Sequence, residues 1–307
     1  MIIIRMTGGL GNQMFQYALY MKLKSQGKEV KFDDINEYRH NLARPIMLPI
    51  FGLEYPRATW EEIIALIDLS PRISQRIKRK LFGKKSVEIR ERDINFDPRL
   101  LENDPAYLTG YFQSEKYFVD IKEDVRKAFA FPNYIDMQFP TDLEQKINEY
   151  QNMIKHTEAI SIHIRRGDYL LVDELYGGIC TDAYYEAAIT YMQTRHPDAV
   201  FYVFSNDIAW VKKWLENRYI EKDGQKNAGN FIIITGTNEY TGFVDMMLMS
   251  QCKHHIIANS SFSWWAAYLN SSPVKTVIAP EKWLNDNDSR DIFTEDMVRI
   301  SAEGAFL

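Results

Sequence analysis

The sequence predicts an α/β protein with two Rossmann-like domains that face each other across a cleft. Short apolar segments alternate with helical segments along the second half of the chain, which is typical of a doubly wound parallel sheet. The first half opens as strand, glycine-rich turn, helix and strand. A segment with prolines and phenylalanines at 131–140 separates the halves. We therefore expect domains at 1–140 and 141–307.

The first domain is best defined at its amino terminus. The run Ile2-Ile3-Ile4 is apolar and β-branched, which favours a strand. Gly27 is a suitable end for the helix that follows, whereas prolines interrupt the poorly patterned region 35–106. The expected elements are strands at 2–5, 30–32 and 107–111 and helices at 14–25 and 115–129.

The second domain has a regular pattern. Its first apolar run, 159–164, is short enough to be a buried strand, and the helical segments between such runs favour parallel pairing. The expected strands are 159–164, 200–205, 231–235, 255–259 and 275–279, and the expected helices are 142–154, 182–194, 207–217, 241–251 and 262–270.

The composition indicates a globular protein of a reducing compartment. The 307 residues are 46% hydrophobic and 13% aromatic, which fits well-filled cores. No apolar run approaches the roughly 20 residues of a membrane span, and the amino terminus lacks the features of a signal peptide. Cys180 and Cys252 are too few for a disulfide framework or a zinc site. We expect a cytosolic protein without a nucleic-acid partner.

A basic segment stands out from the acidic remainder. Residues 72–85 contain seven lysines and arginines and no acid, although the whole chain has a net charge of −5. Ile73, Ile77 and Leu81 repeat at helical spacing. The segment predicts either a solvated amphipathic helix or a peripheral contact with anionic lipid at the inner face of a membrane.

Polar side chains follow several strands of the second domain. Arg165, Arg166 and Asp168 come directly after strand 159–164, and ligands of open α/β sheets bind beyond the carboxyl ends of the strands. Two guanidinium groups suit a phosphate, while surface salt bridges and helix caps are the alternatives. The other candidates at strand ends are His163, Ser205, Asn206, Asp207, Asn259, Ser260, Ser261, Phe262 and Ser263.

The glycine-rich turn of the first domain suggests a different function. Residues 8–14 approach the dinucleotide-binding fingerprint, with Asp33 and Asp34 near the position of a ribose-binding acid. Met14 replaces the third glycine, which weakens this alternative, an NAD-dependent oxidoreductase. A non-catalytic module that binds polyanions through residues 72–85 is the third interpretation.

No metal site is apparent from the sequence. His254 and His255 are adjacent, so on a strand they point to opposite faces, and isolated histidines such as His196 read as surface residues. Asp286 and Asp288 lie in a polar loop that favours a turn.

Taken together, the motifs resemble the bacterial α-1,2-fucosyltransferases of glycosyltransferase family 11. The matching segments occur in family order across nearly the whole chain, and 35–106 matches poorly. They are GGLGNQMFQYA from Gly8, GYFQSEKYF from Gly110, HIRRGDY from His163, FSND from Phe204 and ANSSFSWWAA from Ala258.

The resemblance implies a GT-B fold and an inverting transfer from GDP-β-L-fucose to a galactose-terminated glycan, with GDP-fucose as co-substrate and no metal or other cofactor. It assigns the donor diphosphate to Arg165. Asp168, Asp173 and Glu174 are the candidates for the base that takes the acceptor proton. The first domain is expected on the acceptor side, where Gly9, Gly11, Asn12 and Gln13 reach the cleft, and the second domain binds the donor.

Overall fold

The computed structural model consists of two compact units, Met1–Pro132 and Asn133–Leu307. The division falls a few residues before the boundary placed at 140/141 from the sequence. The structure describes residues 1–37, 44–68, 80–81, 83, 86–132, 139–219, 230–286 and 288–307.

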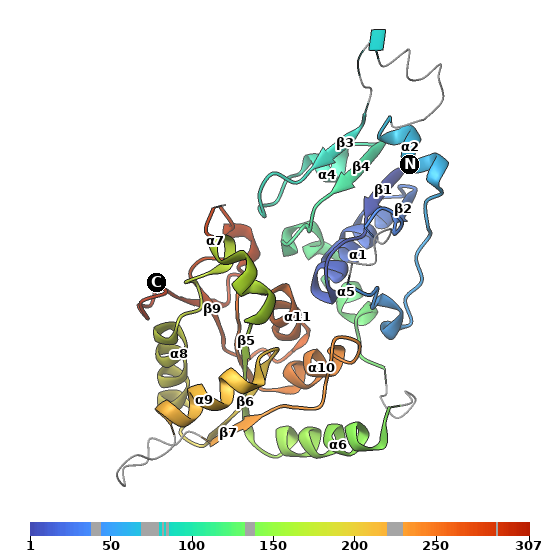
Figure 1. Cartoon of the computed structure of the whole chain (residues 1–307). Helices are drawn as coiled ribbons and strands as arrows, with labels where there is room; N and C mark the ends of the chain where they lie inside the picture. The colour runs from blue at the N-terminus through green and yellow to red at the C-terminus, as the bar shows by residue number, and fades with distance from the viewer. Residues whose placement is uncertain are drawn as a thin grey trace. The chain divides into compact units, whose positions relative to one another are not determined.

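The first unit is a four-stranded parallel sheet in the order β2-β1-β4-β3 (Figure 1). β1 (Ile2–Arg5) pairs with β2 (Val30–Asp33) on one side and with β4 (Ala106–Thr109) on the other. β3 (Glu88–Arg90) forms the edge. The three isoleucines of β1 are fully buried, as the β-branched run predicts.

The helices of the first unit differ from prediction at two places. α1 (Leu10–Ser25) begins four residues early, so most of the expected glycine-rich turn is the first turn of the helix. The expected helix 115–129 is broken at Phe118, which has a non-helical φ of −140° between two 3-10 turns. The remaining elements are η2 (Leu48–Phe51), α2 (Trp60–Leu66), α4 (Arg99–Glu102), η3 (Glu115–Tyr117), η4 (Val119–Ile121) and α5 (Lys122–Ala128).

The second unit is a six-stranded parallel sheet in the order β10-β9-β8-β5-β6-β7. Five of these strands overlap the expected ones, whereas β10, next to the carboxyl terminus, was not expected. The strands are β5 (Glu158–Ile164), β6 (Ala199–Ser205), β7 (Asn230–Ile233), β8 (His254–Ile256), β9 (Val277–Pro280) and β10 (Met297–Ile300). The two parallel sheets confirm the prediction of two Rossmann-like domains, as in the GT-B class.

Helices cover both faces of this second sheet (Figure 1). α8 (Asp182–Arg195) and α9 (Ile208–Arg218) pack on the face that carries Ile160 and Ile162. α6 (Thr141–Lys155), α10 (Phe243–Gln251) and α11 (Ser261–Leu269) contact one another or the strands on the other face. Two short elements, η6 (Gly167–Val172) and α7 (Asp173–Tyr176), follow β5.

The alternation of side chains along β5 places its polar residues on one face of the sheet and its isoleucines on the other. Ile160, Ile162 and Ile164 enter the core beneath α8 and α9. Ser161 and His163, at the alternate positions, therefore point to the opposite face. There His163 meets Ser263 of α11, with Nδ1 and Oγ 2.9 Å apart.

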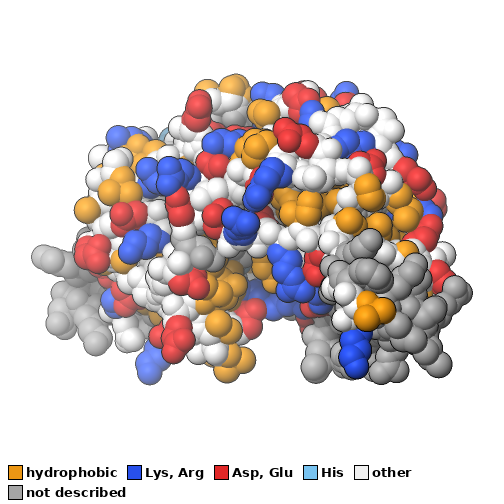
Figure 2. Space-filling model, turned by 90° about the horizontal axis from the view of Figure 1, so that it is seen from above, with side chains coloured by type: hydrophobic (Ala, Val, Ile, Leu, Met, Phe, Trp, Pro, Cys, Tyr) orange, Lys and Arg blue, Asp and Glu red, His pale blue; other side chains and the backbone are white. Residues whose placement is uncertain are grey.

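The basic segment lies largely outside the described residues. Of residues 72–85, the structure describes only 80, 81 and 83, so the predicted helix and its lipid or polyanion contact stay predictions. On the face drawn in Figure 2, lysines and arginines are mixed with acidic side chains. Within the described part of the chain, no helix is long and apolar enough to cross a membrane.

Candidate active site

Three neighbouring strands of the second sheet end in the predicted polar residues. β5 lies between β6 and β8, and all three run parallel. Their carboxyl ends therefore meet at one edge, here called the donor edge. The segments that leave this edge begin at Arg165, Asn206 and Ile257. The structure thus brings together the donor-side candidates that are scattered over about a hundred residues of sequence.

Arg165 is held in place but retains an unused donor. Its guanidinium donates to Asp168 Oδ2 at 2.7 Å and lies 5.5 Å from the Tyr169 ring centroid. The side chain is 17% exposed, and its buried Nε has no hydrogen-bond partner among the described residues. A buried, unpaired N–H is costly, so a hydrogen-bond acceptor at this position would stabilise the arrangement.

Arg166 is oriented by three contacts. Its guanidinium lies 4.1 Å from the Trp210 ring centroid, and Nε lies 3.4 Å from Asp207 Oδ2. Its backbone N–H donates to Asn206 Oδ1 at 2.9 Å. This weak ion pair and the aromatic contact leave the charge only partly compensated.

Gly167 is required between the two arginines and Asp168. Its φ of +51° lies in the left-handed region, and a Cβ there would lie 2.5 Å from Asn206 Nδ2. Any other residue would displace Asn206 or strain the turn.

Several candidates support the site rather than face a ligand. Asp207 caps α9 through the Trp210 N–H, and Ser205 Oγ accepts from the Asp207 N–H. The buried Asn259 donates to the Trp283 carbonyl and accepts from the Cys180 thiol. The side chains of Ser205, Asp207 and Asn259 thus form capping or structural hydrogen bonds within the protein, which was the alternative to ligand binding.

His163 is buried and neutral. Burial, and secondarily the Arg165 charge, lowers its pKa to about 3. The ring packs near Phe262, and Nδ1 pairs with Ser263 Oγ. His163 is therefore unsuited to carry a proton near neutral pH and instead fixes the β5 end against α11.

The amino terminus of α11 points its dipole at the same edge. Its N-cap, Ser260, makes no side-chain capping bond. The first N–H groups of a helix have no intrahelical acceptor, so Phe262 and Ser263 present backbone donors there. Helix amino termini favour phosphate groups for this reason.

The three candidate bases differ in their surroundings. Asp168 is bound to Arg165 and has a 42% exposed side chain. Asp173 and Glu174 are exposed on the single-turn α7. Asp168 is thus placed to orient Arg165, whereas the other two are accessible to a second substrate.

The acceptor-side candidates lie in the first unit, at the start of α1. Gly9 is the N-cap of α1 and Gly11 is buried in its first turn. Asn12 accepts from Gln113 at 2.7 Å. Gln13 is fully buried and bonds to the Gly8 and Pro45 carbonyls and to the Met47 N–H. Its amide is therefore occupied inside the protein, contrary to the expectation that it reaches the cleft.

The same unit gives no support to the oxidoreductase alternative. Met14, at the third glycine position, is fully buried. The Asp33 carboxylate accepts from the Ile35 and Asn36 N–H groups and from the Tyr107 hydroxyl. A ribose would have to displace these internal bonds.

One cluster among the described residues has ligand atoms close enough for a metal. Glu158, His196 and His254 offer atoms within 4.8 Å of one another. However, His254 Nδ1 accepts the Thr276 N–H, so a neutral ring carries its proton on Nε2, which lies 3.2 Å from Glu158 Oε1. The Nε2 lone pair is then absent, which favours a hydrogen-bonded cluster over an ion site. His196 is packed against His254 rather than isolated at the surface.

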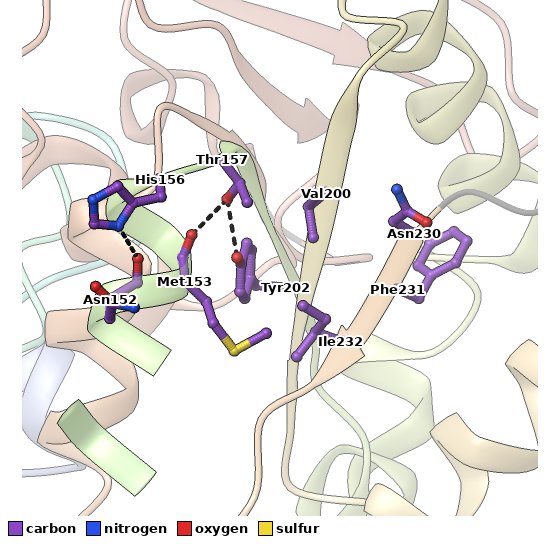
Figure 3. Close-up of a pocket in the computed structure, with 9 residues that line it drawn as sticks. All are labelled: Asn152, Met153, His156, Thr157, Val200, Tyr202, Asn230, Phe231 and Ile232. Atoms are coloured by element: carbon purple, nitrogen blue, oxygen red, sulfur yellow. Dashed lines mark hydrogen bonds between the residues drawn. The ribbon is translucent and has the colours of Figure 1, made fainter. Parts of the chain in front are cut away.

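This cluster and a neighbouring pocket lie at the amino ends of the strands of the second sheet, opposite the donor edge. The pocket has a volume of about 610 Å³ beside the starts of β5, β6 and β7 (Figure 3). Thr157 and Tyr202 join across it by a 2.9 Å hydrogen bond. The seven residues of β5 separate it from the donor edge by about 20 Å, and none of its described lining residues is Lys or Arg. It therefore does not suit the donor diphosphate.

Two buried carboxyl groups do not stand out in the sequence. Burial raises the pKa of Asp245 to about 7; it lies in the first turn of α10 and accepts from Thr237 at 3.0 Å. Burial also raises the pKa of Glu91 to about 7. Neither lies in a recognisable motif, and only the tertiary packing reveals their burial.

Comparisons with known proteins agree on one family of glycosyltransferases. The family model described as "Glycosyl transferase family 11" matches residues 84–301. An Escherichia coli α-1,2-colitosyltransferase is 31% identical, over 97% of this chain and 98% of its own length. The human galactoside α-(1,2)-fucosyltransferase 1 is 27% identical, over 94% of this chain and 70% of its own length. A solved structure of an Arabidopsis thaliana FUT1 mutant with GDP has a TM-score of 0.49 at 12% identity, over 92% of this chain and 71% of that one.

Asp245 predicts a pH-dependent stability. Its pKa is about 7 in the folded protein and about 3.9 in an unfolded chain. The unfolded state therefore loses this proton first, and the free energy of unfolding falls as the pH rises from about 4 to about 7. We expect Asp245→Asn to raise the melting temperature at pH 8 by a few degrees and to change it little at pH 4. The exposed Asp198→Asn is the matched control, and equal gains at both pH values would contradict the assignment.

Proposed function

Because the chain belongs to glycosyl transferase family 11, we propose that it is an inverting α-1,2-fucosyltransferase. It moves L-fucose from GDP-β-L-fucose to a galactose-terminated glycan. The observation that carries the donor assignment is the position of the adjacent Arg165 and Arg166, which follow β5 beside the start of α11. An anion with several acceptor oxygens, such as a diphosphate, accepts both from the guanidinium groups and from the helix N–H groups.

The proposed chemistry depends on stabilising the leaving group. As the bond between fucosyl C1 and the phosphate oxygen breaks, negative charge grows on the β-phosphate of GDP. Arg165 and the α11 N–H groups meet that charge, and Arg166 adds a second guanidinium. Donors already held in position stabilise the transition state more than the ground state.

The relatives leave two related sugars as donors. The α-1,2-colitosyltransferase is the 31% identical relative, and colitose is L-fucose without its 3-hydroxyl. Incubation with GDP-fucose or GDP-colitose and methyl β-D-galactoside, followed by product analysis, separates them. We expect transfer of fucose to the 2-hydroxyl. Transfer from GDP-colitose alone would overturn the donor assignment and leave the glycosyltransferase class intact.

Replacing Arg165 tests the donor site. We expect Arg165→Ala to lower kcat about 10²–10³-fold, the usual effect of losing one transition-state donor. Arg165→Lys keeps the charge but not the planar fork, so it should recover only part of the activity. Circular dichroism checks the fold, and a folded Arg165→Ala protein with normal turnover would remove the proposed role.

The pH dependence of the rate distinguishes the catalytic base from the carboxylate that positions Arg165. In the wild type we expect kcat/KM to rise with pH as the base loses its proton. Removing the base, by Asp173→Asn or Glu174→Gln, should abolish this acidic limb. Asp168→Asn should instead lower kcat at every pH, because it loosens Arg165. Loss of the limb in Asp168→Asn alone would make Asp168 the base.

The proposed reaction requires no metal ion. Arg165, Arg166 and the α11 amino terminus already supply positive charge to the diphosphate, so EDTA should change the transfer rate by less than about twofold. Complete loss of activity in EDTA, restored by Mg²⁺ or Mn²⁺, would contradict this and direct attention to Asp286 and Asp288.

A further inference from the structure

We propose that the turn Gly110–Gln113, at the carboxyl edge of the first sheet, binds the acceptor hexose. Tyr111 packs on the apolar face of the sugar, and the Asn12–Gln113 amide pair bonds its hydroxyls. Glu91 is a positioning residue that holds the turn. This inference rests on the proposed function, because it names where the acceptor sugar of that reaction binds.

Glu91 fixes the backbone of the turn. It lies one residue beyond β3 and accepts from the Tyr111 N–H at 2.7 Å and from the Phe112 N–H at 3.0 Å. Phe112 has a φ of +56°, which is strained for a bulky residue. Two hydrogen bonds to one carboxylate offset that strain and keep the turn in a single conformation.

Gly110 shows how closely the carboxylate and the turn approach. A Cβ on Gly110 would lie 2.5 Å from Glu91 Cβ and 2.6 Å from its Oε2. The buried Gln16 of α1 donates to the Gly110 carbonyl at 3.0 Å and to the Thr7 carbonyl at 3.2 Å. The turn is therefore tied to both β3 and α1.

The same arrangement places an amide pair at the edge. Gln113 Nε2 donates to Asn12 Oδ1 at 2.7 Å, so residues about a hundred positions apart meet where β1 and β4 end. Gln113 is 6% exposed, and Asn12 is more accessible. Amides combine donors and acceptors, as sugar hydroxyls do, so a fixed pair can discriminate hydroxyl positions.

Tyr111 supplies an apolar surface beside these polar groups. It is 40% exposed, although it follows a buried strand. Its pKa is raised by burial and by the nearby Glu37 and Glu91 charges, with Arg5 and Arg44 opposing. A partly exposed ring among amide and carboxyl groups suits a hexose, because β-galactose presents C–H groups on one face and hydroxyls around its rim.

The turn offers groups that bind hydroxyls. Arg5 is paired with Glu37 at 2.8 Å, and the Glu91 carboxyl group, whose pKa burial raises to about 7, already accepts two backbone N–H groups. Carboxyl and amide groups exchange hydrogen bonds with the hydroxyl groups of a neutral sugar. At the donor edge, by contrast, two adjacent arginines lie beside the amino terminus of α11, which favours an anion.

Tyr111→Ala and Tyr111→Phe test the stacking surface. With saturating GDP-fucose, we expect Tyr111→Ala to raise the KM for methyl β-D-galactoside about tenfold, a change typical of one lost aromatic contact. Tyr111→Phe keeps the ring and should stay within about threefold of the wild type. GDP release without acceptor should be unchanged in both, because the donor site is intact. Tyr240→Ala, an exposed tyrosine in the second unit, is the matched control.

Glu91→Gln tests the positioning role. A neutral amide accepts the two backbone N–H bonds less well, so the acceptor KM should rise while the donor KM and acceptor-independent GDP release stay constant. Equal losses of transfer and of GDP release in these variants would mean that the turn serves only the fold, and would overturn the proposal.

Direct binding separates this inference from the proposed function. Saturation-transfer NMR with methyl β-D-galactoside requires no donor or turnover. We expect the signal in the wild type and its loss in Tyr111→Ala. Equal signals in both proteins, or none in the wild type, would overturn the acceptor site. Galactoside binding without transfer from either GDP-sugar would overturn the proposed function instead.

Discussion

The parallel pairing of β5 with β6 and β8 is the constraint on which the candidate active site depends. It brings three strand ends to one edge, although the residues that follow them are far apart in the sequence. Alternation along β5 then sends the isoleucines into the core and His163 toward α11. A one-residue shift in register would reverse both faces, so the hydrophobic pattern also fixes the position of the polar groups.

The electrostatics of the donor edge follow from this packing. Arg165 is largely buried, and the Asp168 carboxylate occupies only some of the N–H groups of its guanidinium. His163 adds no second positive charge, because burial keeps its ring neutral. An incoming anion therefore meets donors that are already oriented, which is the condition for strong stabilisation of developing charge.

The edge of the first sheet differs in chemistry although it arises in the same way. There, the strand ends bring together carboxyl, amide and phenol groups, and Glu91 holds a turn whose backbone is strained at Phe112. Two parallel sheets in one chain thus present two kinds of edge. We propose that one binds the anionic donor and the other the neutral, hydroxyl-rich acceptor.

The sequence by itself determined the alternation of strands and helices, and the motif around Arg165 and Arg166, because both depend on local patterns of two to four residues. The need for glycine at position 167 comes instead from the fold, because the Asn206 side chain lies where a Cβ would be. Only the tertiary structure decided that Gln13 and Asn259 are occupied internally, because their partners come from other parts of the chain. The same holds for Glu91 and Asp245, whose raised pKa values come from burial, a property that arises when distant segments pack together.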